Sequence, residues 1–261
     1  MLSGTIFKQT LRSNLKLWLI FTFILCALNA VLVAVFDNST INSMTEMVKG
    51  TPLEGMMKKT TFLGMLAQTF YTLHGVLIPI IFIVMTANSL VANQVDRGSM
   101  AYLLSTPTKR STIIMTQAVY LVVAILVMFT IETVVGVAAI HIFQGDTELS
   151  LNDYVWLNVG LFLLMFALSS ISFFFSCVFN LSKNSLALGA GIPLAFFLFQ
   201  LISSVDSSLE NLKYITINAL FDTNAILDGE GYVWRFMILA AIGLVLYGAS
   251  IKVFKEKDLP L

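Results

Sequence analysis

Residues 113–140, IIMTQAVYLVVAILVMFTIETVVGVAAI, decide the fold, because Glu132 is the only charged side chain in this long run. A helix of this length spans about 40 Å at 1.5 Å per residue, which exceeds the hydrocarbon layer of about 30 Å. We therefore expect a transmembrane helix here, long enough to tilt or to project beyond the membrane.

Five more apolar runs flank this one, with the charged residues between them; they cover 17–36, 71–92, 155–178, 186–204 and 233–251. The chain is 57% hydrophobic and 11% charged, whereas soluble domains average about 25% charged residues. The sequence therefore predicts an all-α integral membrane protein, a single transmembrane domain over residues 1–261 with six transmembrane helices. The first run is expected to be a retained helix rather than a signal peptide, because no convincing small-x-small cleavage site follows it.

The lysines and arginines predict the orientation. If the N-terminus is inside, ten of the fifteen basic residues are cytoplasmic: Lys8, Arg12, Lys16, Arg97, Lys109, Arg110, Lys183, Lys252, Lys255 and Lys257. The positive-inside rule then favours both ends of the chain in the cytoplasm. The net charge is zero, so the overall balance suggests no nucleic-acid partner.

The first outer loop, residues 37–70, mixes apolar and polar residues. Its apolar positions recur at helical spacing and are Met44, Met47, Val48, Leu53, Met56, Met57, Phe62, Leu63 and Leu66. They predict one or two amphipathic segments, broken at Gly50-Thr51-Pro52 and lying at the outer interface or against the bundle. Two interpretations stay open: a lid packed on neighbouring helices, or a surface that an amphipathic substrate or partner touches.

Few side chains inside the spans could carry chemistry. Glu132 is a possible intramembrane functional group, in substrate contact or helix coupling, and the alternative is a structural hydrogen bond between helices. His74 and His141 have no second ligand at metal-site spacing, and Cys26 and Cys177 lie in apolar runs. We therefore expect no catalytic residue and no metal site.

The loop between the second and third spans is the most informative segment for function. Asn93 is expected to cap a short helix, and Thr106-Pro107 to end it. Val95, Ser99, Tyr102 and Leu103 would share one face. Such a helix on the inner membrane surface can dock into a soluble partner and carry movement to both spans it joins.

Two stretches carry a family resemblance. Residues 95–110, VDRGSMAYLLSTPTKR, resemble the acidic-x-Gly-(Thr/Ser)-x-x-x-Leu-Leu-Ser-x-Pro-x-x-Arg signature of type-2 ABC exporter permeases, between their second and third helices. Residues 254–261, FKEKDLPL, resemble the Phe-x-x-Lys-Asp-Leu ending of small bacterial members. One departure is visible, because Gln94 stands where many relatives have a glutamate, which leaves Asp96 as the only acid of this helix.

The resemblance implies that this chain is the permease subunit of an ABC exporter in a bacterial cell membrane. It implies a coupling helix, with Gln94, Asp96, Arg97, Gly98, Ser99, Tyr102, Leu103 and Leu104 as the residues that engage an ATPase. The partners would be two ATPase subunits, which hold the ATP and Mg, a second permease copy or paralogue, and membrane lipid. The chain itself has no Gly-x-x-x-x-Gly-Lys-(Ser/Thr) loop, so it is expected to be no enzyme and to hold no cofactor.

The expected cargo is an amphipathic peptide, antimicrobial or lipid-like molecule moved outward, because few charges line the spans. Two other classes of membrane protein make different demands on the sequence. An ion-driven secondary transporter usually has inverted repeats and several buried ionisable groups. A membrane-bound enzyme such as an intramembrane protease needs a nucleophile with its base, a metal pair or an Asp dyad at membrane depth. One Glu and two scattered His residues do not meet these needs.

Overall fold

The computed structural model describes residues 2–36, 40, 43, 46–47, 61–105, 108–145, 150–205 and 207–258. Within this part of the chain, six helical stretches are long and apolar enough to cross a membrane, which confirms the six-helix prediction. They are Gly4–Val35, Phe62–Asp96, Arg110–Phe143, Leu151–Val178, Ser182–Ser203 and Val233–Glu256.

The individual elements follow one another in the order α1 (Gly4–Val35), α3 (Phe62–Leu66), η2 (Ala67–His74), α4 (Gly75–Leu90), α5 (Ala92–Asp96), α6 (Met100–Leu104), α7 (Arg110–Phe143), α8 (Leu151–Val178), α9 (Ser182–Val205), η3 (Ser207–Ile215), η4 (Ile217–Leu220), α10 (Thr223–Leu227) and α11 (Val233–Glu256). Of the short elements, η2 is a π-helix, and η3 and η4 are 3₁₀-helices.

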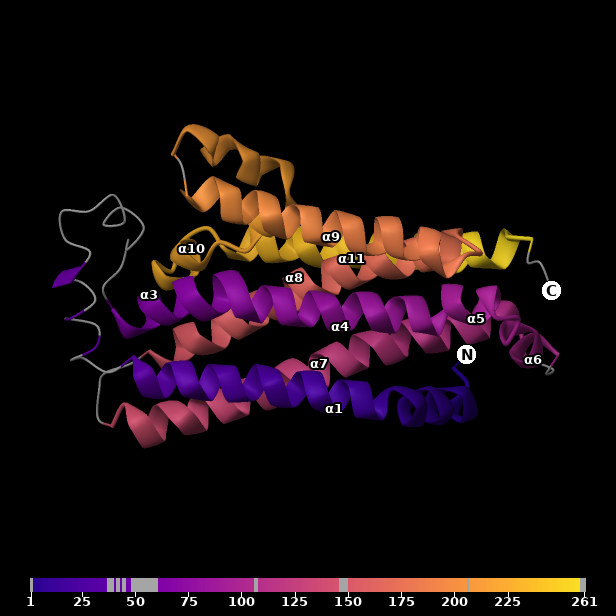
Figure 1. Cartoon of the computed structure of the whole chain (residues 1–261), viewed down its shortest axis with the longest axis horizontal. Helices are drawn as coiled ribbons and strands as arrows, with labels where there is room; N and C mark the ends of the chain where they lie inside the picture. The colour runs from indigo at the N-terminus through magenta and orange to yellow at the C-terminus, as the bar shows by residue number, and fades with distance from the viewer. Residues whose placement is uncertain are drawn as a thin grey trace.

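The long helices lie side by side along one axis, with α8 at the centre of the bundle (Figure 1). Helix α8 packs against α4, α7, α9 and α11, and its Leu157, Leu161, Leu164 and Leu168 are fully buried. Both termini and α5–α6 lie at one end, whereas α3 and α10 lie at the other. The ends and the α5–α6 segment thus share a side, as the orientation prediction requires, and that this side is cytoplasmic stays a prediction.

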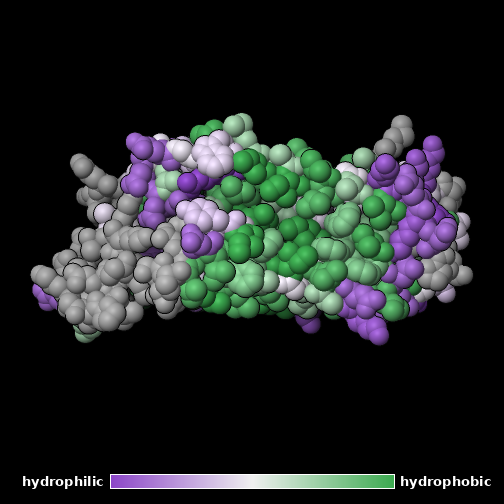
Figure 2. Space-filling model, turned by 90° about the horizontal axis from the view of Figure 1, so that it is seen from above, coloured by the Kyte–Doolittle hydropathy of each residue, from purple (hydrophilic) through white to green (hydrophobic). Residues whose placement is uncertain are grey.

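The surface of the bundle is divided into zones. Figure 2 shows, on the face it presents, a hydrophobic band across the middle and hydrophilic residues gathered toward both ends. Large apolar side chains of the long helices are exposed, including Phe23 of α1 and Leu244 and Val245 of α11. An aqueous protein would not expose so continuous an apolar surface, whereas lipid tails solvate it.

Helices α1 and α7 run parallel and are joined by polar contacts along their whole length. The partners follow one another in the same order along both helices, at sequence separations of 103 to 113 residues, so the contacts form a ladder. The bonds run from Ser3 N to Thr116 Oγ1 (3.1 Å), from Thr10 Oγ1 to Gln117 Oε1 (3.1 Å), from Trp18 Nε1 to the Ala124 carbonyl (2.8 Å), from Asn29 Nδ2 to Glu132 Oε1, and from Gln144 Nε2 to the Val33 carbonyl (2.7 Å).

Two helical stretches extend beyond the predicted spans. Helix α1 begins at Gly4, before the span predicted from residue 17, because its basic first part packs on α7 and is capped by Ser3. The second stretch begins at Phe62, before the span predicted from residue 71, and its Phe62, Leu63 and Leu66 are buried in α3. Met47 is exposed, and the other apolar positions of the predicted outer segments, Met44, Val48, Leu53, Met56 and Met57, lie outside the described residues.

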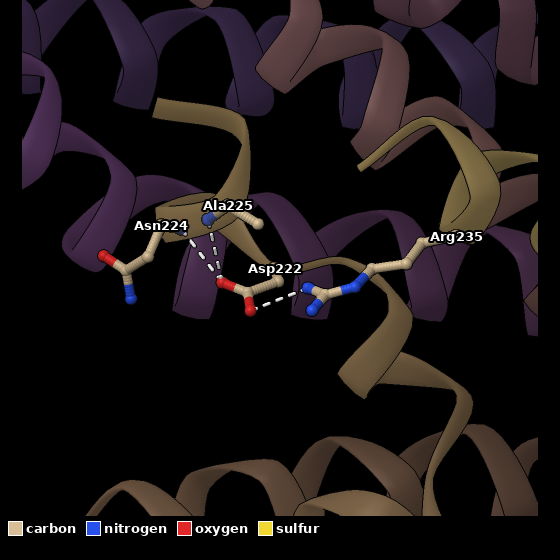
Figure 3. Close-up of polar contacts among 4 residues, drawn as sticks. All are labelled: Asp222, Asn224, Ala225 and Arg235. Atoms are coloured by element: carbon tan, nitrogen blue, oxygen red, sulfur yellow. Dashed lines mark hydrogen bonds and ion pairs between the residues drawn. The ribbon is translucent and has the colours of Figure 1, made fainter. Parts of the chain in front are cut away.

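The segment between α9 and α11 is held by an ion pair at the end of the bundle opposite the termini. Asp222 Oδ1 accepts hydrogen bonds from the backbone N–H groups of Asn224 (3.0 Å) and Ala225 (3.2 Å), which caps α10 (Figure 3). Its Oδ2 lies 2.7 Å from Arg235 Nη1 near the start of α11. Burial alone raises the pKa of Asp222, but Arg235 and the two N–H groups outweigh it and hold the pKa below its ordinary value.

This pairing predicts a pH dependence. Because the folded pKa lies below the unfolded value of about 3.9, the carboxylate contributes stability above that pH and loses it as the pH falls through the folded pKa. At pH 7 we expect Asp222→Asn to lower the free energy of unfolding by about 1 kcal/mol, since the pair is partly exposed. Thermal melts of both proteins should converge as the pH falls below the unfolded pKa of about 3.9 and through the folded pKa. A difference that persists at low pH would contradict this role.

A second prediction concerns the close approach of α11 to α8. A Cβ at Gly243 would lie 2.2 Å from Cε1 of Phe166, whereas a Cβ at Gly248 on the same helix would meet nothing within 4 Å. We expect Gly243→Ala to displace the Phe166 ring and to destabilise the protein by about 1–3 kcal/mol. The matched control, Gly248→Ala, should melt within a degree or two of the parent in the same detergent. Equal melting temperatures for the two variants would show that the contact is dispensable.

Candidate coupling site and buried polar cluster

The segment expected to form one short helix consists of two, joined by a tight turn. Val91 departs from helical geometry (φ −130°, ψ −74°) and ends α4, and α5 follows at Ala92–Asp96. Gly98 adopts φ 70°, a left-handed conformation that costs a side-chain-bearing residue about 1 kcal/mol or more. The glycine of the signature thus separates α5 from α6, Met100–Leu104.

The turn changes which side chains share a face, so the predicted face was wrong. Val95 and Met100 are buried and anchor α5 and α6 to the bundle. Arg97 and Ser99 are exposed, and Tyr102 is 80% exposed. Helical spacing cannot be counted across Gly98, because the turn there interrupts the helix. The cap prediction was also wrong, since Asn93 lies inside α5 and no side chain caps that helix.

The remaining signature residues have different surroundings. Leu103 and Leu104 are half-buried and pack against the core, so they help to hold α6 in place, and their contact with an ATPase stays a prediction. Gln94 is half-buried, and its backbone carbonyl accepts a hydrogen bond from Ser99 Oγ at 3.2 Å. The exposed surface, which we term the docking surface, therefore comprises Asp96, Arg97, Gly98, Ser99 and Tyr102.

Asp96 links the docking surface to a helix that the sequence did not associate with it. Its Oδ2 accepts a hydrogen bond from the backbone N–H of Ser182, 3.1 Å away at the first residue of α9. The carboxylate therefore caps α9 from outside and matches the positive end of that helix. Asn88 of α4 donates to Ser182 Oγ at 2.8 Å. Ser182 thus joins α4, α5 and α9 in one clasp.

The second stretch with a family resemblance closes the same end of the bundle. Phe254 is fully buried. Lys257 Nζ donates to the Cys177 carbonyl in the last turn of α8 (3.0 Å), and Arg110 Nη1 donates to the Lys257 carbonyl (3.2 Å). Burial lowers the pKa of Lys257 to about 8, partly offset by Cys177. The C-terminal segment thus ties α7, α8 and α11 together, and residues 259–261 lie outside the described chain.

Glu132 lies far from the docking surface, in a buried polar cluster. The cluster joins α1, α7 and α8, because Asn29 donates to Glu132 Oε1 and lies 2.7 Å from Tyr154 Oη. Gly136, one turn further along α7, leaves room for Tyr154, whose Oη lies 1.7 Å from the position a Cβ would take. All three polar side chains are fully buried. These bonds favour a helix-joining role for Glu132 over substrate contact.

Neither His residue takes part in such a cluster. Nδ1 of His74 lies 3.2 Å from the Thr69 carbonyl within η2. Among the described residues, no group of three or more His, Cys, Asp or Glu side chains could hold a metal ion.

Comparison with known families decides what kind of protein this arrangement serves. The family model described as "ABC-2 family transporter protein" matches residues 7–259, almost the whole chain. This chain belongs to the ABC-2 transporter family. A search of curated proteins finds no match. The resemblance that rested on residues 95–110 and 254–261 is thereby confirmed at the level of the family.

Membership in the family fixes the general role. ABC-2 membrane subunits are multi-pass permeases without an ATPase domain. Such permeases typically carry no cofactor, and the family in general works with an ATPase partner. The six spans and the docking surface at one end agree with this role.

The buried cluster of this permease yields a test of the Glu132 role. Glu132→Gln keeps an acceptor for Asn29, so we expect a loss of stability below about 1 kcal/mol, in line with hydrogen bonds between membrane helices. Glu132→Ala leaves Asn29 without that acceptor and opens a cavity, which should cost about 2–3 kcal/mol. Melting temperatures of the purified permease measure both. ATP-driven transport that fails in Glu132→Gln at unchanged stability would contradict a purely helix-joining role.

Proposed function

We propose that this permease is the transmembrane subunit of an ATP-driven exporter that moves an amphipathic molecule outward. Two ATPase subunits supply the energy, and two permease chains, identical or paralogous, form the route. The observation that carries the proposal is the docking surface: it is exposed, rigidly anchored by Val95 and Met100, and bonded through Asp96 to α9.

The geometry supports a mechanical link from the docking surface to the spans. A force on α5–α6 acts directly on α4, which precedes it in the chain, and on α7, which follows it. Through the Ser182 clasp the same force acts on α9. Closure of the ATPase pair on binding ATP would therefore shift three spans of each permease together and favour the outward-open arrangement.

The character of the spans supports an amphipathic cargo. Large apolar side chains cover the exposed faces of α1, α9 and α11. Glu132, the one acid deep inside a span, is engaged within the bundle and offers no charged site to a strongly polar cargo. A peptide with an apolar face, an antimicrobial or a lipid-like molecule fits such a surface.

The proposal is tested by separating docking from transmission. Tyr102→Ala removes an 80% exposed aromatic from the docking surface, so we expect the Kd for the ATPase subunit to rise about fivefold or more. The matched control is Tyr214→Ala, which removes a 73% exposed aromatic from η3. Asn88→Ala removes the bond from α4 to Ser182 Oγ without touching the docking surface, so it should retain ATPase binding while lowering transport per ATP hydrolysed.

These measurements need the permease copurified with its ATPase and the complex reconstituted in vesicles. Unchanged ATPase affinity in Tyr102→Ala, or an equal loss in Tyr214→Ala, would overturn the docking assignment. Inward movement of cargo in the same vesicles would overturn the direction.

A further inference from the structure

An apolar groove runs between α1 and α7 on the outside of the bundle. It has a volume of about 250 Å³ and is lined by Phe7, Leu11, Leu15, Trp18, Tyr120, Val123, Ala124 and Val127. The α1 residues recur at helical spacing and form one stripe. The groove is somewhat smaller than the roughly 300–1,000 Å³ of enclosed ligand pockets, so it suits part of a flexible chain.

The walls of the groove are fixed, although its mouth is open. The rings of Phe7 and Tyr120 meet edge to face with centroids 5.8 Å apart. Trp18 is held by its hydrogen bond to the Ala124 carbonyl, 2.8 Å away. Leu11 and Leu15 remain 42% and 41% exposed. An apolar ligand can therefore enter from the side without rearrangement of the helices.

A basic hollow lies next to this groove along α1. It is lined by Gly4, Thr5, Lys8, Gln9 and Arg12, all of them exposed. Helix α1 contains no acidic residue to neutralise these cations. The positive end of the α1 dipole points to the same region. Along α1, Lys8 and Arg12 of the hollow thus follow directly after Phe7 and Leu11 of the groove.

We propose that the groove and the hollow together bind one anionic phospholipid from the leaflet on the side of the chain termini. The headgroup phosphate lies between Lys8 and Arg12, and one acyl chain runs along the groove toward Trp18. Charge complementarity selects this occupant. A second copy that packed the same face across a two-fold axis would bring its own Lys8 and Arg12 opposite these cations, which is repulsive.

The experiment uses Trp18 as an internal probe. The chain has three tryptophans, and Trp156→Phe/Trp234→Phe leaves only the one in the groove. This full-length protein is placed in vesicles of phosphatidylcholine with increasing amounts of phosphatidylglycerol, and one of the two lipids carries bromine near the middle of an acyl chain. Quenching of Trp18 then reports the relative affinity of each lipid for the groove.

We expect an anionic preference of about 25-fold, since Lys8 and Arg12 each contribute about a factor of five near the surface. Lys8→Gln/Arg12→Gln should abolish the preference. The matched control, Lys252→Gln/Lys255→Gln, removes two exposed cations of α11 near the same end and should leave it unchanged. Both double variants should melt like the parent, because all four side chains are exposed.

Three outcomes would overturn the proposal. One is equal quenching by the two brominated lipids in the parent. Another is an anionic preference that persists in Lys8→Gln/Arg12→Gln. The third is efficient disulfide-linked dimer formation by Leu15→Cys beyond that of the parent with its native cysteines, which would show that a second copy covers the groove.

Discussion

Hydrocarbon offers no hydrogen bonds, so every polar group in the spans needs a partner within the protein. Some hydroxyl groups bond back to their own helix, as Thr130 and Thr133 do with carbonyls one turn earlier, at 2.8 and 2.7 Å. The bonds that cross between helices specify which faces meet. The contact of Asn29 with Glu132 and the 2.7 Å contact of Ser169 Oγ with Tyr247 Oη are of this kind. Apolar packing alone would leave rotation and register of the helices free.

The number of spans could be predicted because hydropathy is a property of each run by itself, whereas their ends could not. Residues 4–16 carry three cations and read as a polar leader, yet they continue α1 because α7 offers a packing surface. Residues 62–70 contain enough polar residues to resemble a loop, yet Phe62 and Leu66 are buried. The π-helical turns of η2 left no signal in the sequence. Tertiary contacts decided each of these boundaries.

The candidate site was predictable only in part, because some of its features are local in the sequence and others depend on contacts between helices. The signature located the docking surface, and Gly98 itself marked the break between α5 and α6, which a helix-only interpretation of the spacing missed. The role of Asp96 could not be read from its neighbours in the chain, because its partner Ser182 is 86 residues away. Glu132 could be singled out as a costly buried acid. Its partners Asn29 and Tyr154 lie on other helices and needed the fold to be found.

Helix α9 shows how a span can be both held and able to bend. Pro193 has no N–H, so the Gly189 carbonyl loses its partner within the helix. Ser172 of α8 supplies the missing donor, with its Oγ 2.7 Å from that carbonyl. At Gly189, α9 is therefore hydrogen-bonded to α8 at the centre of the bundle. Its first residue, Ser182, is hydrogen-bonded to Asp96 and Asn88. A force on the docking surface therefore acts on the first turn of α9. Further along the helix, Gly189 is bonded to α8 and lacks its backbone hydrogen bond to residue 193. Proline has already removed the backbone hydrogen bond between residues 189 and 193, so bending at Gly189–Pro193 does not break that bond. We therefore expect α9 to flex there.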